Sequence, residues 1–423
     1  MYEDSITASN KIITDKVITE ILDKMNDNKK VFSTLETIIL VVISLIIGLC
    51  IGTLYNKKNI IVNTKQDDEY LEEFIKNYNY ILNNYYKDID KESLINNAIA
   101  GMMESLDDPY SVYLDGEESD NFTITLDGSY EGIGVQIGKD EDTGYMLITT
   151  VFKDSPAEKA GLLPGDEIIS LDDTQAKDIS ASEFSSLIKK GKTSEFKLVI
   201  LRDKEEKEIT VKRDKVTLKS VASEVYEENN KKIGYIYIGI FANNTLDQFK
   251  EELEKLEKEK INYLIIDVRG NTGGHLTSVD SILDLFLSKN QIMYQFEQAG
   301  KKKAIYATWK EKKDYKIILL GDESSASASE VLIAGLRENL GSNFIGKKTY
   351  GKGTVQELIT LSDGTQYKIT IKKWLTPKGN WIDDTNGIEP DIEVELDKKY
   401  YTTYDTSDDT QLQKALEYIK NDN

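Results

Sequence analysis

Histidine and cysteine are almost absent from this chain. Its 423 residues include one histidine, His275, and one cysteine, Cys50. A single cysteine excludes a disulfide framework, a zinc site built from several cysteines and most iron–sulfur chemistry. A single histidine excludes a multi-histidine metal site, and only His275 could serve a Ser-His-Asp arrangement. We therefore expect no metal and no cofactor, and a hydrolytic reaction would need a general base other than histidine.

Positive charge is scarce relative to negative charge. The chain has 53 Lys and Arg against 74 Asp and Glu, a formal net charge of −21. This balance argues against a nucleic-acid partner, because clustered basic side chains are needed to neutralise phosphates. The length corresponds to two to four structural units at roughly 100–200 residues per domain.

Charge is missing altogether from residues 37–56, and the stretch from Ile38 to Ile51 is nearly all aliphatic. A transmembrane helix needs about 20 apolar residues, so we predict an N-terminal cytoplasmic segment at 1–34 and a single membrane anchor at 35–56. The alternatives are a cleaved signal peptide and a buried core helix. A signal peptide is disfavoured because the run starts late and is long. Lysine pairs flank the run on both sides, so the charge rule does not decide the orientation.

Residues 66–114 are predicted to form a helical N-terminal region. Apolar residues between Tyr70 and Leu82 recur at spacings of three and four, which is typical of an amphipathic helix. A second helix is predicted from Lys91 to Leu106, before Asp107-Asp108-Pro109. These helices are interpreted as docking elements.

From residue 120 to 214 the pattern changes to short strands with glycine-rich turns. Strands are predicted at 145–151, 167–171, 196–201 and 208–212, and helices at 155–160 and 181–190. This order resembles a PDZ domain, most specifically from Ser155 to Leu171. In such domains successive N–H groups of a glycine loop receive the carboxylate of a peptide's C-terminus. The corresponding residues here are Gly132, Ile133, Gly134 and Val135, although the loop could also be only a tight entry turn.

Residues 215–396 are predicted to form an α/β core. Strands at 233–240 and 261–267 flank an amphipathic helix at 245–260, and this alternation favours parallel pairing. A further core strand is predicted at 315–320 and a hairpin at 355–371. Residues 397–423 are expected to form a C-terminal tail, mobile apart from a short helix near Leu412 to Ile419.

Residues 346–352 have the spacing of a nucleotide-binding P-loop up to the last position, where Gly353 replaces the Ser or Thr that holds magnesium. A P-loop must also lead into a helix. The residues from Thr354 to Leu361 instead have the β-branched composition of a strand. The pattern therefore argues against a magnesium NTPase.

Two further segments have both an ordinary and a functional interpretation. Asp267 to Gly274 is a glycine-rich turn after a strand, which could face N–H groups toward an oxyanion. Ser327 opens a helix, and with Glu330 three residues later it forms the pattern of a capping box. The same position would also suit a nucleophile, because the helix dipole favours a developing oxyanion there.

Three motifs in order are similar to those of the carboxy-terminal processing peptidases, also called tail-specific proteases. They are Asp267–Gly274, Ser325–Glu330 and Tyr350–Gln356, and the likeness extends over roughly Tyr70 to Leu396. The family resemblance implies a ClpP/crotonase-like α/β peptidase core with a PDZ domain and N-terminal helices, here preceded by one transmembrane helix.

The resemblance also implies roles for individual residues. Ser327 would be the nucleophile, Lys352 the general base and Gln356 the residue that orients the lysine, on the same strand face as Lys352. The N–H groups of Gly273 and Ala328 would form the oxyanion hole. Glu338 stands where some members have an Asp, so a third charge-relay position is in question there. His275 follows the glycine pair and is interpreted as incidental.

A lysine acts as a base only when it is neutral, so its pKa must fall from about 10.4. Burial in an apolar pocket lowers it by up to about 3–5 units. We therefore hypothesise a serine endopeptidase that cleaves through an acyl-enzyme and recognises protein substrates by their C-termini. The uncharged run predicts one membrane helix in the cell membrane, and we place the peptidase domain on its extracytoplasmic side as part of the hypothesis. The resemblance allows a homo-oligomer. A membrane-tethered PDZ adaptor with an inert core is the rival hypothesis, but neither Ser327 nor Lys352 is lost.

Overall fold

The computed structural model describes residues 65–140, 143–308, 312–361 and 364–422. The chain divides into two compact units between Leu94 and Ile95. Helix α3 (Lys65–Asn84) belongs to the first unit, and helix α4 (Lys91–Glu104) begins there. Both helices lie where the sequence predicts them. The predicted anchor at 35–56 is outside the described residues, and none of the described helices is long and apolar enough to cross a membrane.

The last part of the region predicted to be helical contains a strand. Strand β1 (Val112–Leu114) pairs antiparallel with strand β18 (Gln366–Leu375). Helix α5 (Gly116–Asp127) follows and occupies the first residues of the predicted PDZ span. A three-residue strand carries little periodicity of its own, and its partner is distant in the chain, so local pattern does not reveal it.

A small β-rich domain follows α5. Its antiparallel sheet has the order β3-β4-β5-β7-β8, with β6 paired to β5, while β2 and β9 form a separate pair. Its elements are β2 (Ser129–Gly132), β3 (Val135–Lys139), β4 (Met146–Val151), α6 (Pro156–Ala160), β5 (Glu167–Leu171), β6 (Thr174–Gln175), η2 (Ala176–Asp178), α7 (Ala181–Lys190), β7 (Glu195–Arg202), β8 (Glu205–Lys212) and β9 (Asp214–Thr217). The strands and helices predicted for this domain are confirmed.

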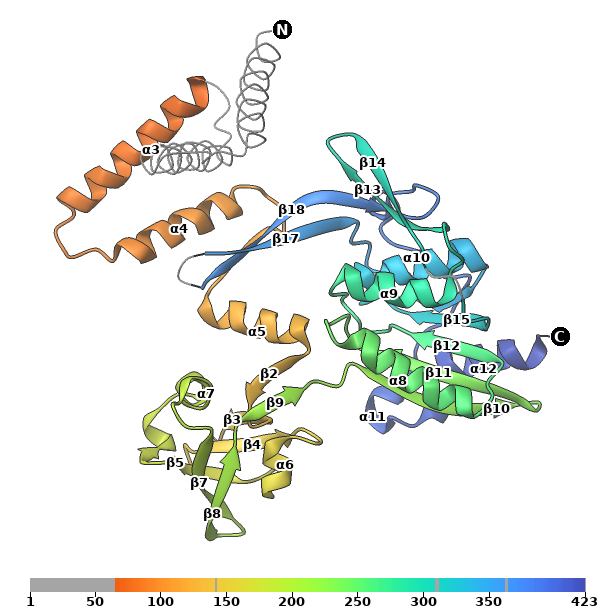
Figure 1. The fold of residues 1–423 in the computed structure, drawn as a ribbon, viewed down its shortest axis with the longest axis horizontal. Helices are drawn as coiled ribbons and strands as arrows, with labels where there is room; N and C mark the ends of the chain where they lie inside the picture. The colour runs from red at the N-terminus through yellow and green to blue at the C-terminus, as the bar shows by residue number, and fades with distance from the viewer. Residues whose placement is uncertain (1–64, 141–142, 309–311, 362–363, 423) are drawn as a thin grey trace, which may run out of the picture. The chain divides into compact units, whose positions relative to one another are not determined.

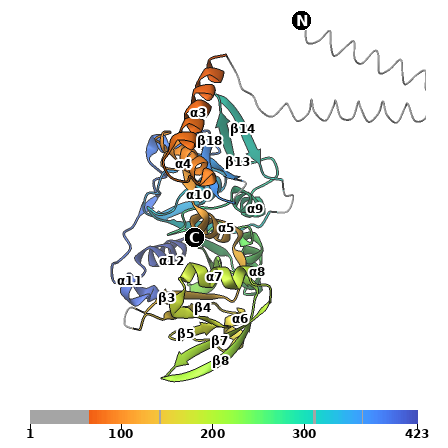
Figure 2. The same ribbon diagram turned by 90° about the vertical axis from the view of Figure 1, so that its left-hand side faces the viewer.

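The local sequence explains these elements. Helix α6 begins after Ser155, whose hydroxyl accepts from Glu158 N at 3.2 Å, and ends at Gly161 with a φ of 86°. Along the strands, alternate residues such as Ile148 and Ile168 are fully buried in the domain's own core. Strand β3 is at the edge of the sheet, and helix α7 packs beside it (Figure 2).

The third region is the α/β core predicted from the sequence (Figure 1). Its main sheet has the order β10-β11-β12-β15-β16-β19, and every pair from β11 to β19 is parallel. Its elements are β10 (Val221–Glu228), β11 (Lys231–Ile238), α8 (Thr245–Lys258), β12 (Tyr263–Asp267), α9 (Leu276–Phe286), β13 (Ile292–Gln298), β14 (Lys301–Tyr306), β15 (Lys316–Gly321), α10 (Ala328–Leu340), β16 (Asn343–Gly346), β17 (Thr354–Thr360), β18, η3 (Ile382–Thr385) and β19 (Ile392–Glu393).

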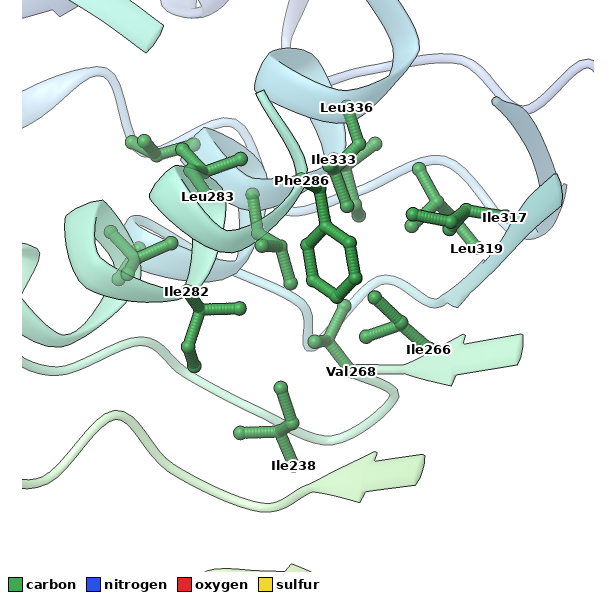
Figure 3. Packing of buried hydrophobic residues seen from close by; sticks show 14 of the residues in the cluster. Ile238, Ile266, Val268, Ile282, Leu283, Phe286, Ile317, Leu319, Ile333 and Leu336 are labelled. Atoms are coloured by element: carbon green, nitrogen blue, oxygen red, sulfur yellow. The ribbon is translucent and has the colours of Figure 1, made fainter. Parts of the chain in front are cut away.

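Both faces of this sheet are buried. Leu264 and Ile266 of β12 face helices α8, α9 and α10, whereas Tyr263 and Ile265 belong to a second cluster on the other face. In Figure 3 the ring of Phe286 from α9 lies among residues of the sheet and of α10. Burial on both faces explains why the strand sequences are continuously apolar rather than alternating.

A second sheet is organised by β18, which pairs with β1, β13 and β17. The hairpin of β17 and β18 is predicted correctly. The β13–β14 hairpin is a feature that the sequence interpretation missed. Because β17 begins directly after the Tyr350–Gly353 loop, this sheet supports the segment that contains Lys352.

The C-terminal segment packs against the core through the short helix predicted near Leu412 to Ile419, which is confirmed as α12 (Thr410–Asn421). The segment also contains α11 (Tyr400–Thr403) and η4 (Thr406–Asp408). Leu412, Ala415, Leu416 and Ile419 of α12 are buried against the face of the main sheet opposite to α8, α9 and α10. Their spacing of three and four residues places them on one side of a helix, which is the reason for this docking.

Candidate active site

The loop after strand β15 turns into helix α10 at Ser327. Ser327 has φ 55° and ψ −114°, a conformation that non-glycine residues rarely adopt. Such strain costs about 1–3 kcal/mol and persists only where the surroundings impose it. Its neighbours Ser325, Ala326, Ala328 and Ser329 are buried, whereas Ser327 is partly exposed. Of these five residues, only Ser327 presents its side chain at the surface.

Hydrogen bonds hold this turn against the glycine-rich loop that follows β12. The backbone oxygen of the fully buried Asn271 accepts from Ala326 N at 3.0 Å and from Ser329 Oγ at 2.8 Å. Ser325 Oγ donates to Val268 O at 2.8 Å. The two buried serines are therefore structural, and they leave Ser327 as the serine available for chemistry.

Gly273 lies directly against Ser327. A side-chain carbon at Gly273 would lie 3.0 Å from Ser327 Cβ and 3.2 Å from Ala328 N, and φ at this glycine is +110°. A larger residue is therefore excluded by space and by backbone strain. The N–H of Gly273 donates to Asn271 Oδ1 at 2.8 Å in this conformation. Within the described residues the N–H of Ala328 forms no hydrogen bond.

The buried carboxyl group of Glu330 connects the serine turn to the lysine loop. Its Oε2 accepts from Ser327 N at 2.8 Å and from Lys352 N at 2.9 Å. Its Oε1 accepts from Gly351 N at 2.7 Å and from Thr349 Oγ1 at 2.6 Å. Burial raises the pKa of Glu330, and these hydrogen bonds oppose that rise. Since one oxygen atom contacts both backbones, Ser327 and Lys352 are brought together, as the sequence motifs predict.

The amine of Lys352 lies in a partly dehydrated environment. Burial, together with the nearby charge of Lys368, lowers its pKa to about 8, against the opposing influence of Asp108 and Glu330. At neutral pH about a tenth of such an amine is unprotonated, compared with far less than a thousandth at the ordinary pKa. The structure therefore supplies the property that a lysine base needs.

The side chain of Lys352 rests on an aromatic ring. Its Nζ is 4.6 Å from the centre of the Tyr110 ring. In the part of the chain that the structure describes, this Nζ forms no ion pair and no hydrogen bond, either to Ser327 Oγ or to another group. The backbone of Lys352 is fixed, because its oxygen accepts from Trp374 Nε1 at 2.7 Å.

No hydrogen bond between Gln356 and Lys352 is found in the part of the chain that the structure describes. Lys352 precedes strand β17, which begins at Thr354. The pairing of β17 with β18 also shifts between Val355 and Gln356. Strict alternation along one strand therefore does not place Lys352 and Gln356 on the same face, contrary to the expectation from the sequence. Gln356 Nε2 instead donates to Thr354 Oγ1 at 3.0 Å and to Thr370 Oγ1 at 3.1 Å. Its predicted orienting role has no direct hydrogen bond to support it.

Two other predicted positions lie apart from the lysine. Glu338 is eleven residues beyond Ser327 on α10, or about 16 Å along a helix axis, and its Oε2 accepts from Lys378 N at 2.7 Å. The structure does not bring this carboxylate to Lys352. His275 precedes α9, and burial lowers the pKa of its imidazole while Asp127 opposes the shift. Its interpretation as incidental stays a prediction.

The glycine loop of the small domain, residues 132–135, contains backbone N–H groups that are available to bind a ligand. The oxygen of Ile133 accepts from Ala157 N at 2.8 Å, and that of Gly134 accepts from Phe152 N at 2.9 Å. Within the described residues, the N–H groups of Ile133 and Gly134 donate no backbone hydrogen bond in a turn, loop or cap. The adjacent edge of β3 is open to a further strand, which is the geometry of C-terminal peptide capture.

Some residues of the site were not assigned from sequence. From the sequence alone, Glu330 is interpreted as a helix cap. Its hydrogen bonds to the backbone of Gly351 and Lys352 are not indicated by any pattern in the neighbouring sequence. Asn271 lies within the recognised motif Asp267–Gly274, so the sequence placed it near the site without giving it a role. Asp108 and Tyr110 lie inside the span from Tyr70 to Leu396 that resembles the family, but no motif marks them or Lys368. The strand β17 after Gly353 confirms that the P-loop interpretation is wrong.

Comparison with known proteins decides the family. Residues 232–394 match peptidase family S41, residues 54–118 match the activating protease CtpB N-terminal domain, and residues 132–212 match the PDZ domain. Carboxy-terminal processing protease CtpB of Bacillus subtilis is 40% identical over 330 residues, which cover 77% of this chain and 68% of that protein. The chain belongs to the carboxy-terminal processing proteases of family S41.

Other members are also similar. Carboxy-terminal processing protease CtpA of Bacillus subtilis is 36% identical over 331 residues, covering 78% of this chain and 70% of that protein. Among solved structures, the photosystem II D1 C-terminal processing protease is 24% identical with a TM-score of 0.45, covering 76% of this chain and 86% of that chain.

Membership confirms three predictions. The chain is a serine-type endopeptidase of the carboxy-terminal processing class, it contains a PDZ domain, and its fold is a multidomain α/β fold with an S41 core. The rival hypothesis of an inert adaptor is not supported by these matches.

Proposed function

We propose that this family S41 protease cleaves peptide bonds with a Ser327–Lys352 dyad. The observation that carries the proposal is the Glu330 carboxyl group, which binds the backbones of both residues through one oxygen atom. Nucleophile and base are thereby held on adjoining loops. The strained backbone of Ser327 and the lowered pKa of Lys352 support the same assignment.

The reaction would follow the usual order of acyl transfer. Neutral Lys352 takes the proton of Ser327 Oγ as that oxygen attacks the peptide carbonyl carbon. The oxyanion accepts a hydrogen bond from Ala328 N–H, and from Gly273 N–H once that group leaves Asn271. The protonated lysine then gives its proton to the departing amine, which leaves an acyl-enzyme on Ser327. Water then attacks the acyl carbon as Lys352 takes its proton, and the protonated lysine returns a proton to Ser327 Oγ as the acid leaves.

Substrates would be proteins or peptides recognised by their C-termini. The unengaged N–H groups of Ile133 and Gly134 and the open edge of β3 support this part of the proposal. Gly132 and Val135 flank the same loop and complete the predicted carboxylate site.

We further propose that residues 35–56 anchor the chain in the cell membrane with the peptidase on the extracytoplasmic side. The support is the uncharged sequence of residues 37–56. The chain should stay in the membrane fraction after an alkaline carbonate wash, and deletion of residues 1–56 should release it. A homo-oligomer is compatible with the exposed apolar side chains of α3, which include Tyr70, Leu71, Phe74 and Ile75.

The dyad is tested by Ser327→Ala and Lys352→Ala variants, assayed on a fluorogenic peptide with a free C-terminal carboxylate. Each should lose about a thousandfold or more in kcat, because removal of either partner of a nucleophile–base pair removes the same step. Matched controls are Ser324→Ala and Lys348→Ala, which change an exposed serine and a surface lysine paired with Glu389. Undiminished turnover by Lys352→Ala would refute the dyad.

A further inference from the structure

A segment before the PDZ domain is fixed next to the catalytic lysine. Strand β1 aligns with β18, with Val112 opposite Lys368. Just before it, the buried Ser111 Oγ accepts from Thr370 N at 3.0 Å and donates to Asp108 Oδ2 at 2.5 Å. These bonds determine where Tyr110, between Asp108 and Ser111, is placed.

The ring of Tyr110 covers the amine of Lys352, with 4.6 Å between Nζ and the ring centre. Burial raises the pKa of the Tyr110 phenol, and Tyr350 adds to the rise, so the ring stays neutral at working pH. The charged groups that face Lys352 are Lys368 on β18, Asp108 beside Tyr110, and Glu330 on α10. Within the described residues, Tyr110 is the aromatic ring in contact with this amine.

We propose that Tyr110 is a positioning residue of the peptidase, whose ring shields the Lys352 amine from water and holds it against the ring face. This inference rests on the dyad proposed above. Tyr110 comes from the segment that precedes the PDZ domain. The surroundings of the general base Lys352 are therefore completed by a residue from outside the S41 match at 232–394.

The ring has two opposing effects on the amine. Attraction between a cation and the ring face favours the ammonium form. Exclusion of water favours the neutral form. Burial is the largest influence on the pKa of Lys352, so we expect the exclusion of water by the ring to outweigh the attraction. Removal of the ring should therefore admit water and return the amine toward its protonated form.

The test compares Tyr110→Leu with Tyr110→Phe, which keeps the ring and removes only the hydroxyl. The pH profile of kcat/KM is measured on the fluorogenic peptide. In Tyr110→Leu the acid limb should move up by about one pH unit, with KM unchanged. Tyr110→Phe should keep the wild-type profile. Tyr113→Leu is the matched control, because Tyr113 lies on β1 opposite Tyr367, and its profile should also stay in place.

A second measurement does not depend on turnover. In a Ser327→Ala background, the Lys352 Cε resonance is titrated by NMR in folded protein, with Lys352→Arg used for assignment. The Tyr110→Leu change should raise the titration midpoint, as should Tyr110→Met if the leucine variant does not fold. An unchanged midpoint in the folded variant would overturn the role of Tyr110, even if Ser327 and Lys352 prove essential. Undiminished turnover by Lys352→Ala would instead refute the dyad, while the titration still decides whether Tyr110 shields the amine.

Discussion

At the scale of single residues, the ionisation of Lys352 is set by groups from three separate segments. Burial and the charge of Lys368 lower its pKa, whereas Asp108 and Glu330 raise it. Asp108 itself stays ionised: burial raises its pKa, but hydrogen bonds with Ser111 and Thr370 and the charge of Lys352 bring it below the ordinary value. The base therefore lies between one cation and two acidic groups.

This arrangement predicts opposite effects for two charge-neutralising variants. Lys368→Met removes a positive charge, so protonated Lys352 becomes less unfavourable and its pKa rises. Asp108→Asn removes a negative charge, so the pKa falls. The acid limb of kcat/KM, which we expect near the Lys352 pKa of about 8 in the wild type, should move up in the first variant and down in the second, each by about half a pH unit. Movement of the acid limb in the same direction in both variants would contradict the electrostatic account.

At the scale of secondary-structure elements, the sequence predicted those helices and strands that a local pattern of apolar residues marks. The β17–β18 hairpin follows from two alternating runs around Gly364, and α10 follows from the apolar residues between Val331 and Leu336. The serine and lysine of the site were found because each belongs to a contiguous motif. The pairing of β1 with β18 joins residues far apart in the chain, so no local signal reveals it, nor the positions of Asp108, Tyr110 and Lys368.

The C-terminal segment illustrates the same limit. Its polar composition between Tyr401 and Thr410 suggested mobility, yet Asp409 is buried and accepts two hydrogen bonds, each of 2.8 Å, from Arg269. Arg269 also pairs with Asp267 at the end of β12. The fold of this segment depends on a partner in the glycine-rich loop, which sequence pattern does not connect to it.

Asp409→Ala should therefore destabilise the core. It leaves a buried guanidinium with one carboxylate partner instead of two, and the loss of a buried partner costs about 3 kcal/mol. The midpoint of urea unfolding, followed by tryptophan fluorescence, should fall. Asp408→Ala is the matched control, because it removes the partner of the exposed Lys399. Its midpoint should change much less, and equal losses in the two variants would contradict the assigned role.

At the scale of the whole molecule, the chain combines a PDZ domain with a peptidase core. The proposed capture site lies in residues 132–212, which match the PDZ domain, and the proposed dyad lies in residues 232–394, which match peptidase family S41. This division predicts that recognition of the substrate's terminus and cleavage are separable by changing the substrate without changing the enzyme.

Two peptides of identical sequence, one ending in a carboxylate and one in a carboxamide, measure this separation. Amidation removes the charge that the Ile133 and Gly134 N–H groups would bind, so kcat/KM should fall about tenfold or more. Acetylation of the peptide's amino terminus is the matched control and should have little effect. Equal cleavage of acid and amide would contradict recognition through the C-terminus.

The contact between Arg269 and Asp409 has a consequence for how the protein matures. The two residues are separated by 140 positions, and a ribosome makes chains from the N-terminus onward. The glycine-rich loop after β12 thus receives its second carboxylate partner only after all three family motifs have been translated. A nascent chain therefore contains Ser327 and Lys352 before it contains Asp409, so the ion pairs of Arg269 are completed last during synthesis.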